Sequence, residues 1–173
     1  MITTPRLLLR RHRPDDFPAV LAMWSDPAVT RHIGGKPSTR EECWARFLKY
    51  FGHWELVGYG YFVIEERASA SFVGEVGFGD FRRELEPSID GAPEIGWALN
   101  VRMHGRGYAT EAARAALAWG DANFPSPRTV CIIDPGNTAS IRVAEKLGYH
   151  EVCRTTYRSE PTILYERIRS STT

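Results

Sequence analysis

Two glycines lie between a strand-like run and an alanine-rich run in residues 102–109, RMHGRGYA. Residues 94–101, EIGWALNV, predict a strand, and residues 110–119, TEAARAALAW, predict a helix. A chain that passes from strand through glycines into a helix leaves unpaired N–H groups at the helix start, and these groups bind anions. We therefore expect a pyrophosphate site made by Arg102, His104, Gly105, Arg106, Gly107, Tyr108, Ala109 and Thr110.

The two best-known phosphate motifs do not match this loop. The dinucleotide pattern G-x-G-x-x-G fails because Thr110 occupies the third glycine position, and the nucleotide-triphosphate pattern G-x-x-x-x-G-K-[ST] is absent. The spacing that does occur is Arg102-x-x-Gly105-x-Gly107. Taken alone, this spacing also fits a tight turn that binds nothing.

A second segment makes a ligand site the better interpretation. Residues 134–149, DPGNTASIRVAEKLGY, follow the β-branched run at 129–133 and predict a helix that Asn137 caps. Gly148 suits the position just after the helix, where a left-handed backbone is common. Capping alone would account for an asparagine at this position.

Together the two segments resemble the GNAT superfamily of N-acetyltransferases, and the glycine loop is similar to that family's acetyl-coenzyme-A loop. The resemblance covers nearly the whole chain. Residues 6–16 (RLLLRRHRPDD) and 24–35 (WSDPAVTRHIGG) look like the branch that includes ribosomal-protein-alanine N-acetyltransferases. The resemblance implies that acetyl-CoA is the acetyl-donor cosubstrate. Its pantetheine arm would contact Asn137 and the backbone of Leu99, Asn100 and Val101.

The resemblance also implies attack of a primary amine on the thioester. Only a neutral amine attacks, so the site needs a proton acceptor. Glu94 is the candidate base, because several family members place a catalytic glutamate at this strand position; a structural ion pair or a solvated strand end is the alternative. Glu160 and His104 are weaker candidates for the base.

The group that protonates the departing thiolate is a second question. Many family members carry a tyrosine seven residues after the asparagine, but this chain has Ala144 there. In the ribosomal-protein-alanine branch a serine at the position of Ser140 has been assigned this role. The alternative is that the Ser140 hydroxyl only hydrogen-bonds coenzyme A or the helix backbone.

The expected fold class is α/β, with the GNAT fold as a single domain over residues 1–173. Its mixed, mostly antiparallel sheet would have seven strands, splayed between strands 4 and 5 and flanked by about four helices. Beyond the two segments above, we expect helices after Pro14 and after the capping box at Thr39, the first ending at Asp26-Pro27. The remaining strands are expected at 7–11, 61–66, 72–78, 151–157 and 162–168, with a loop at 84–92.

Composition excludes several other classes of protein. The chain has 173 residues, with 22 basic and 21 acidic side chains, which gives no electrostatic footprint for nucleic acid. It has no apolar run long enough for a membrane span and no signal-peptide pattern at the N-terminus. The three cysteines match neither a disulfide framework nor a metal site. We expect a cytoplasmic enzyme without a metal, as a monomer or homodimer.

The acceptor is the least constrained part of the prediction. The N-terminal resemblance favours the α-amine of a protein or peptide as the partner. The alternatives are a small amine, such as a polyamine, amino acid or aminoglycoside, and a module that binds coenzyme A without catalysis.

Overall fold

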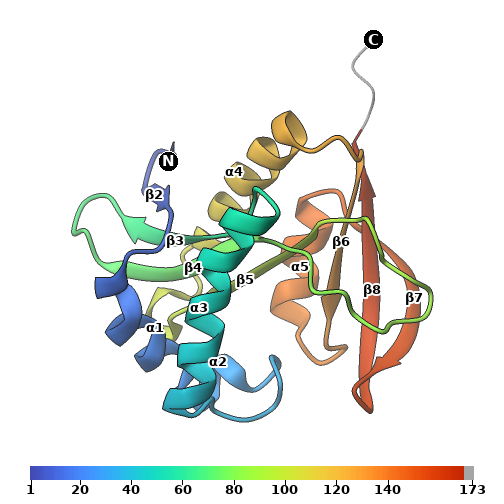
Figure 1. Cartoon of the computed structure of the whole chain (residues 1–173), viewed down its shortest axis with the longest axis horizontal. Coiled ribbons are helices and arrows are strands. Elements are labelled where there is room, and N and C mark those ends of the chain that lie inside the picture. The colour runs from blue at the N-terminus through green and yellow to red at the C-terminus, as the bar shows by residue number, and fades with distance from the viewer. Residues whose placement is uncertain (170–173) are drawn as a thin grey trace.

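The computed structural model describes residues 1–169 and builds them around one eight-stranded sheet (Figure 1). The strand order is β1-β2-β3-β4-β5-β6-β8-β7. Neighbouring strands are antiparallel except β5 and β6, which are parallel. The strands are β1 Ile2–Thr3, β2 Leu7–Arg10, β3 Tyr61–Glu66, β4 Phe72–Gly79, β5 Glu94–Leu99, β6 Arg128–Ile133, β7 His150–Tyr157 and β8 Glu160–Ile168.

Helices cover both faces of this sheet. Helices α1 and α3 pack on the face to which Ala98 of β5 belongs, and α4 and α5 pack on the opposite face. Figure 1 shows α3 crossing in front of the strands. The helices are α1 Phe17–Trp24, α2 Pro27–Thr30, α3 Arg40–Leu56, α4 Tyr108–Asn123 and α5 Thr138–Lys146, with short 3-10 turns at Pro14–Asp16 and Val101–Met103.

The predicted α/β GNAT fold is confirmed, with differences at several element ends. The structure adds the short strand β1 and the short helix α2. The first helix was expected to end at Asp26-Pro27, and α1 ends just before it, at Trp24. The Asp26 side chain then accepts from the Ala28 N–H at 2.8 Å and begins α2. The strand expected to reach Val101 ends at Leu99, because the Asn100 side chain caps the 3-10 turn that follows.

The parallel strands β5 and β6 touch at one residue pair, Glu94 and Val130. The Val130 N–H donates to the Pro93 carbonyl at 3.1 Å, and beyond this point the two strands separate. Figure 1 shows α5 where the two ribbons spread apart. This is the predicted splay, here between β5 and β6 because β1 adds one strand to the count.

A buried carboxylate ties the α3 face together. Glu75 of β4 is fully buried and accepts hydrogen bonds from the His12 ring (2.7 Å), the Trp24 indole (2.9 Å) and the Tyr50 hydroxyl (2.7 Å). These donors come from the segment after β2, from α1 and from α3, and satisfying a buried carboxylate in this way offsets its desolvation.

The segment between β4 and β5 is a loop, as expected for 84–92, and it covers the sheet beside α3. Its apolar residues Leu85 and Ile89 are buried against Val130 of β6 and Leu164 of β8. The α3 face therefore has two covers, α3 over the first strands and this loop over β6 and β8. Among residues 1–169, no helix has the length and apolar character needed to cross a membrane.

Strands β3 and β4 depend on glycine for their close approach. A Cβ on Gly77 would lie 2.4 Å from the Gly60 carbonyl oxygen and from the Tyr61 Cα. We expect Gly77→Ala to lower the free energy of unfolding by about 1–3 kcal/mol, because the backbones must move apart. Urea unfolding followed by circular dichroism measures this.

Gly52→Ala is the matched control, since a Cβ on Gly52 in helix α3 meets nothing within 4 Å. That variant should be as stable as the parent or up to about 1 kcal/mol more stable. Equal unfolding midpoints for the two variants would contradict the close approach of β3 and β4.

Candidate functional site

The glycine loop forms the strand-to-helix turn that the sequence predicts. Gly105 and Gly107 have φ values of 74° and 76°, in the left-handed region that favours glycine. Gly107 precedes the first residue of α4, so the N–H groups of Tyr108, Ala109 and Thr110 lie in the first helical turn. Their donors and the helix dipole suit an anion at this point.

Residues of the N-terminal segment, far away in the sequence, hold this loop in place. The Arg6 guanidinium donates to the Arg106 carbonyl at 2.9 Å and to the Glu111 carboxylate at 2.7 Å. The Thr4 hydroxyl donates to the same carboxylate at 2.7 Å. Sequence analysis missed Arg6, because about a hundred residues separate it from the loop that it supports.

The side chains of the loop divide into two sets. The Tyr108 ring is buried, and its hydroxyl donates to Glu66 of β3. Both contacts anchor the start of α4. The Arg106 guanidinium lies 4.0 Å from the same carboxylate and is half exposed. Arg102 is exposed, so Arg102 and Arg106 can both add positive charge for a bound phosphate.

The end of β5 differs from the expectation in its backbone pairing. The Asn100 N–H donates to the Val73 carbonyl at 2.9 Å and so faces β4. The Leu99 carbonyl accepts a hydrogen bond from the His104 ring at 2.9 Å, so the ring of His104 helps to hold the glycine loop against the end of β5. The Pro93 carbonyl points toward β6, where it accepts from the Val130 N–H. Backbone groups alternate along a strand, so those of Trp97 and Leu99 point to the same side, into the split.

Asn137 and Ser140 lie across the split from β5. The Asn137 side-chain oxygen accepts from the Ser140 N–H at 3.1 Å and caps α5, as predicted. This arrangement leaves the Asn137 NH2 group able to donate to a ligand. The Ser140 hydroxyl oxygen accepts from the Trp97 indole of β5 at 3.3 Å, so its own proton can point elsewhere.

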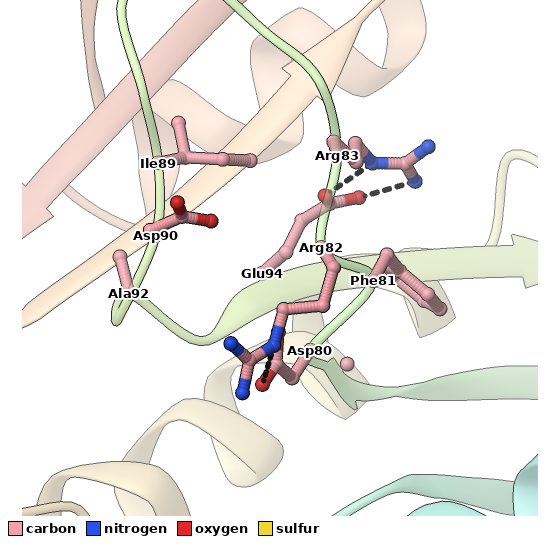
Figure 2. A pocket seen from close by; sticks show the side chains of 9 residues that line it. Asp80, Phe81, Arg82, Arg83, Ile89, Asp90, Ala92 and Glu94 are labelled. Carbon is pink, nitrogen blue, oxygen red and sulfur yellow. Dashed lines mark hydrogen bonds and ion pairs between the residues drawn. The ribbon is translucent and has the colours of Figure 1, made fainter.

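Glu94 forms an ion pair at the narrow end of the split. Both of its oxygens accept from Arg83, at 2.5 and 2.8 Å, and Figure 2 shows the two groups facing each other. Burial lowers the pKa of Arg83, but the Glu94 hydrogen bond and charge outweigh this and raise it above its ordinary value. The ion-pair arrangement weighed for Glu94 is therefore present, and sequence analysis missed Arg83.

The side chains of the two candidate catalytic residues, Glu94 and Ser140, lie on opposite faces of β5. Glu94 belongs to the α3 face, while Ser140 on α5 meets Trp97 on the other face. A cavity of about 10 Å³ lies beside Glu94, between the two limbs of the loop that Figure 2 shows. Such a cavity has space for about one water molecule.

Comparison with known proteins agrees with this geometry. Residues 6–150 match the acetyltransferase (GNAT) domain family. The chain belongs to the GNAT superfamily. It is 33% identical to the uncharacterized protein YkkB of Bacillus subtilis (strain 168), over 96% of this chain and 94% of YkkB. A putative GNAT-family acetyltransferase structure from Bordetella pertussis superposes with a TM-score of 0.84 at 30% identity, covering 96% of this chain and 98% of the other.

More distant structures share the fold. RimL, a ribosomal L7/L12 α-N-protein acetyltransferase in complex with coenzyme A, has a TM-score of 0.77 at 19% identity, covering 96% of each chain. A spermidine N-acetyltransferase from Vibrio cholerae, in complex with CoA and spermine, has a TM-score of 0.75 at 15% identity, covering 96% of this chain and 97% of the other. Family membership makes this chain an acyl-CoA-dependent N-acetyltransferase.

The support of the loop by Arg6 leads to a prediction. Arg6→Gln removes the donor to the Arg106 carbonyl and the partner of Glu111 without removing a loop residue. We expect the dissociation constant for coenzyme A to rise about three- to tenfold, the size of the net contribution of one ordinary hydrogen bond. Isothermal titration calorimetry measures it.

Arg67→Gln is the control for Arg6→Gln. Arg67 holds the same N-terminal segment through the Thr4 and Pro5 carbonyls, but among residues 1–169 its side chain forms no hydrogen bond or ion pair with the glycine loop. Equal effects of the two variants would show that Arg6 acts on the N-terminal segment and not on the loop.

Proposed function

We propose that this enzyme transfers acetyl from acetyl-CoA to the α-amine of a peptide or protein, by direct attack within a ternary complex. One observation carries the proposal: the parallel strands β5 and β6 separate after a single pair, and the glycine loop and the start of α4 follow the open end of β5. The acceptor amine would approach a thioester in this split from the α3 face.

The donor would use the groups that line the split. The pantetheine amides would pair with the backbone groups of Trp97 and with the Leu99 N–H, as an added strand pairs with a sheet edge. The Leu99 carbonyl already accepts from the His104 ring. The Asn137 NH2 group would donate to the same arm. The pyrophosphate would accept from the N–H groups of the glycine loop, with Arg102 and Arg106 adding charge.

Proton transfers would occur on the two faces of β5. Glu94, on the α3 face, would take the proton from the attacking amine, directly or through a water in the adjacent cavity. Ser140 would give its proton to the departing thiolate, since its oxygen already accepts from Trp97 and its O–H is free to turn into the split. Backbone N–H groups of β5 would stabilise charge on the thioester oxygen.

An α-amine suits such a site better than a lysine-like amine. Its pKa is near 8, against about 10.4 for a lysine, so far more of it is neutral at physiological pH and a weak base suffices. The structural neighbours include a protein α-amine acetyltransferase and a spermidine acetyltransferase, so a small amine is the second candidate acceptor.

Donor binding has a direct test in the glycine loop. Gly107→Glu places a carboxylate where the pyrophosphate would approach, and we expect calorimetry to show no measurable binding of coenzyme A. Gly58→Glu is the matched control, because Gly58 has a similar φ of 78° and open space but lies beyond α3. Normal binding by a folded Gly107→Glu protein would refute the loop as the phosphate site.

The role of Glu94 has a test that separates a base from an ion-pair partner. Glu94→Gln should lower kcat about a hundredfold, and the loss should shrink above pH 8, where the amine is already neutral. Glu94→Gln/Arg83→Gln removes both members of the pair, so no unpaired charge remains. If Glu94 is the base, kcat of the double variant stays as low as that of Glu94→Gln. Recovery of kcat in the double variant would assign Glu94 to the ion pair alone.

A further inference from the structure

Four basic side chains gather on the α3 face around the start of β5. Two belong to α3, one to the loop after β4 and one to the turn between β7 and β8. They are Arg46, Lys49, Arg83 and Arg158. We call this group the basic cluster.

Two arginines of the basic cluster, Arg83 and Arg158, stack on neighbouring aromatic rings. The Arg83 guanidinium lies over the Phe81 ring at 4.8 Å and over the Tyr157 ring at 4.9 Å. Arg158 lies over the same Tyr157 ring at 5.3 Å. The basic side chains of the loop and of the β7–β8 turn are therefore held on one shared aromatic platform.

Arg46 approaches from the α3 side and is only partly satisfied. Its guanidinium lies 3.8 Å from the centre of the Trp24 ring, and its Nε atom is buried without a hydrogen-bond partner. A buried charged donor without an acceptor is unfavourable, and a bound ligand is one way to satisfy it.

The charges of the cluster act on one another. Burial lowers the pKa of Lys49, and the like charges of Arg46, Arg83 and Arg158 lower it further. Of the four basic side chains of the cluster, Arg83 alone has a carboxylate of residues 1–169 within ion-pair distance, namely Glu94. Glu160 follows Arg158 by two residues, at the start of β8; it is exposed and forms no ion pair with residues 1–169.

The position of the cluster separates it from the phosphates of the donor. The glycine loop lies beyond Leu99, at the other end of β5, and a strand of this length spans about 16 Å. Arg83 of the cluster pairs with Glu94, and the Tyr61 hydroxyl lies over Gly96, two residues further along β5. The basic cluster therefore borders the side from which an amine would approach the thioester.

We propose that the acceptor carries a carboxylate close to the amine that is acetylated, and that Arg46, Lys49 and Arg158 bind this carboxylate. This inference rests on the proposed acetyl transfer and narrows its substrate class. Charge-assisted hydrogen bonds to arginine and lysine would hold an acidic acceptor, while a polyamine would be repelled. An acidic peptide N-terminus and a free amino acid both supply such a carboxylate.

The test compares acceptors that differ only in charge. Peptides with a free N-terminal alanine would carry aspartate, asparagine or lysine at the next positions, and free glutamate and spermidine would complete the series. Release of the coenzyme A thiol measures kcat/KM. We expect aspartate peptides, or free glutamate, to exceed their neutral or basic counterparts by at least about tenfold, with the difference falling as salt is added.

Variants of the cluster decide whether its charges cause the preference. Lys49→Gln/Arg158→Asn removes two charges, and asparagine tolerates the left-handed backbone of Arg158, whose φ is 51°. We expect this variant to reduce the ratio of acidic to neutral kcat/KM to about threefold or less. Lys146→Gln, an exposed lysine at the end of α5, is the control and should keep the parent ratio.

The possible failures are distinguishable. Turnover of neutral and acidic peptides at equal rates, or of spermidine above both, would overturn the acidic acceptor and leave the acetyl transfer intact. Turnover with no amine would overturn the proposed function. In that event calorimetry with the N-acetylated aspartate peptide decides the inference: binding lost in Lys49→Gln/Arg158→Asn supports the carboxylate site, and absence of binding to the parent refutes it.

Discussion

The rest of the structure depends on two parallel strands that part after one residue pair. In a continuous sheet, β5 and β6 would satisfy each other's backbone groups along their whole length. Here the pairing stops at Glu94 and Val130, although antiparallel partners hold β5 and β6 firmly from their outer sides. Beyond that pair, the facing edges of β5 and β6 are not hydrogen-bonded to each other. An extended ligand with amide groups can pair with such a strand edge.

The two faces of β5 then have different tasks. On one face lie the glycine loop that begins α4, the Asn137 cap of α5 and the Ser140 hydroxyl, which we propose bind the donor. On the other face, β5 itself supplies Glu94, and the loop after β4 supplies Arg83. Helix α3 supplies Arg46 and Lys49, and the β7–β8 turn supplies Arg158. The buried Glu75 network fixes α1 and α3 to β4, so the basic side chains of α3 project from a rigid support. The donor and the acceptor would thus meet across the thickness of one strand.

The sequence predicted the features that local patterns encode. The glycine loop, the capping box at Thr39 and the Asn137 cap are all present, because each depends on residues a few positions apart. The splay between the strands followed only from the resemblance to the family. Composition could not distinguish α2 from a loop, because a four-residue helix has no periodicity to detect.

Contacts between distant segments were not predictable in the same way. Arg83 and Glu94 are close in the sequence, but nothing in the intervening loop indicates that its two ends return to each other. The Arg6 support of the glycine loop depends on how the N-terminal segment packs on α4. The approach of Arg158 to Lys49 depends on how α3 and the last hairpin pack together. Only an assembled fold places these side chains, so the acceptor side was the part of the site that sequence patterns left open.

Hydrogen exchange tests the central claim most directly, since the split between β5 and β6 is claimed to bind the donor along its backbone. Amide exchange would be followed by mass spectrometry with and without acetyl-CoA. We expect slower exchange in residues 97–99 and 105–110 when acetyl-CoA is present, with β7 unchanged as the internal reference. Unchanged exchange in both segments at saturating acetyl-CoA would contradict the split as the donor site.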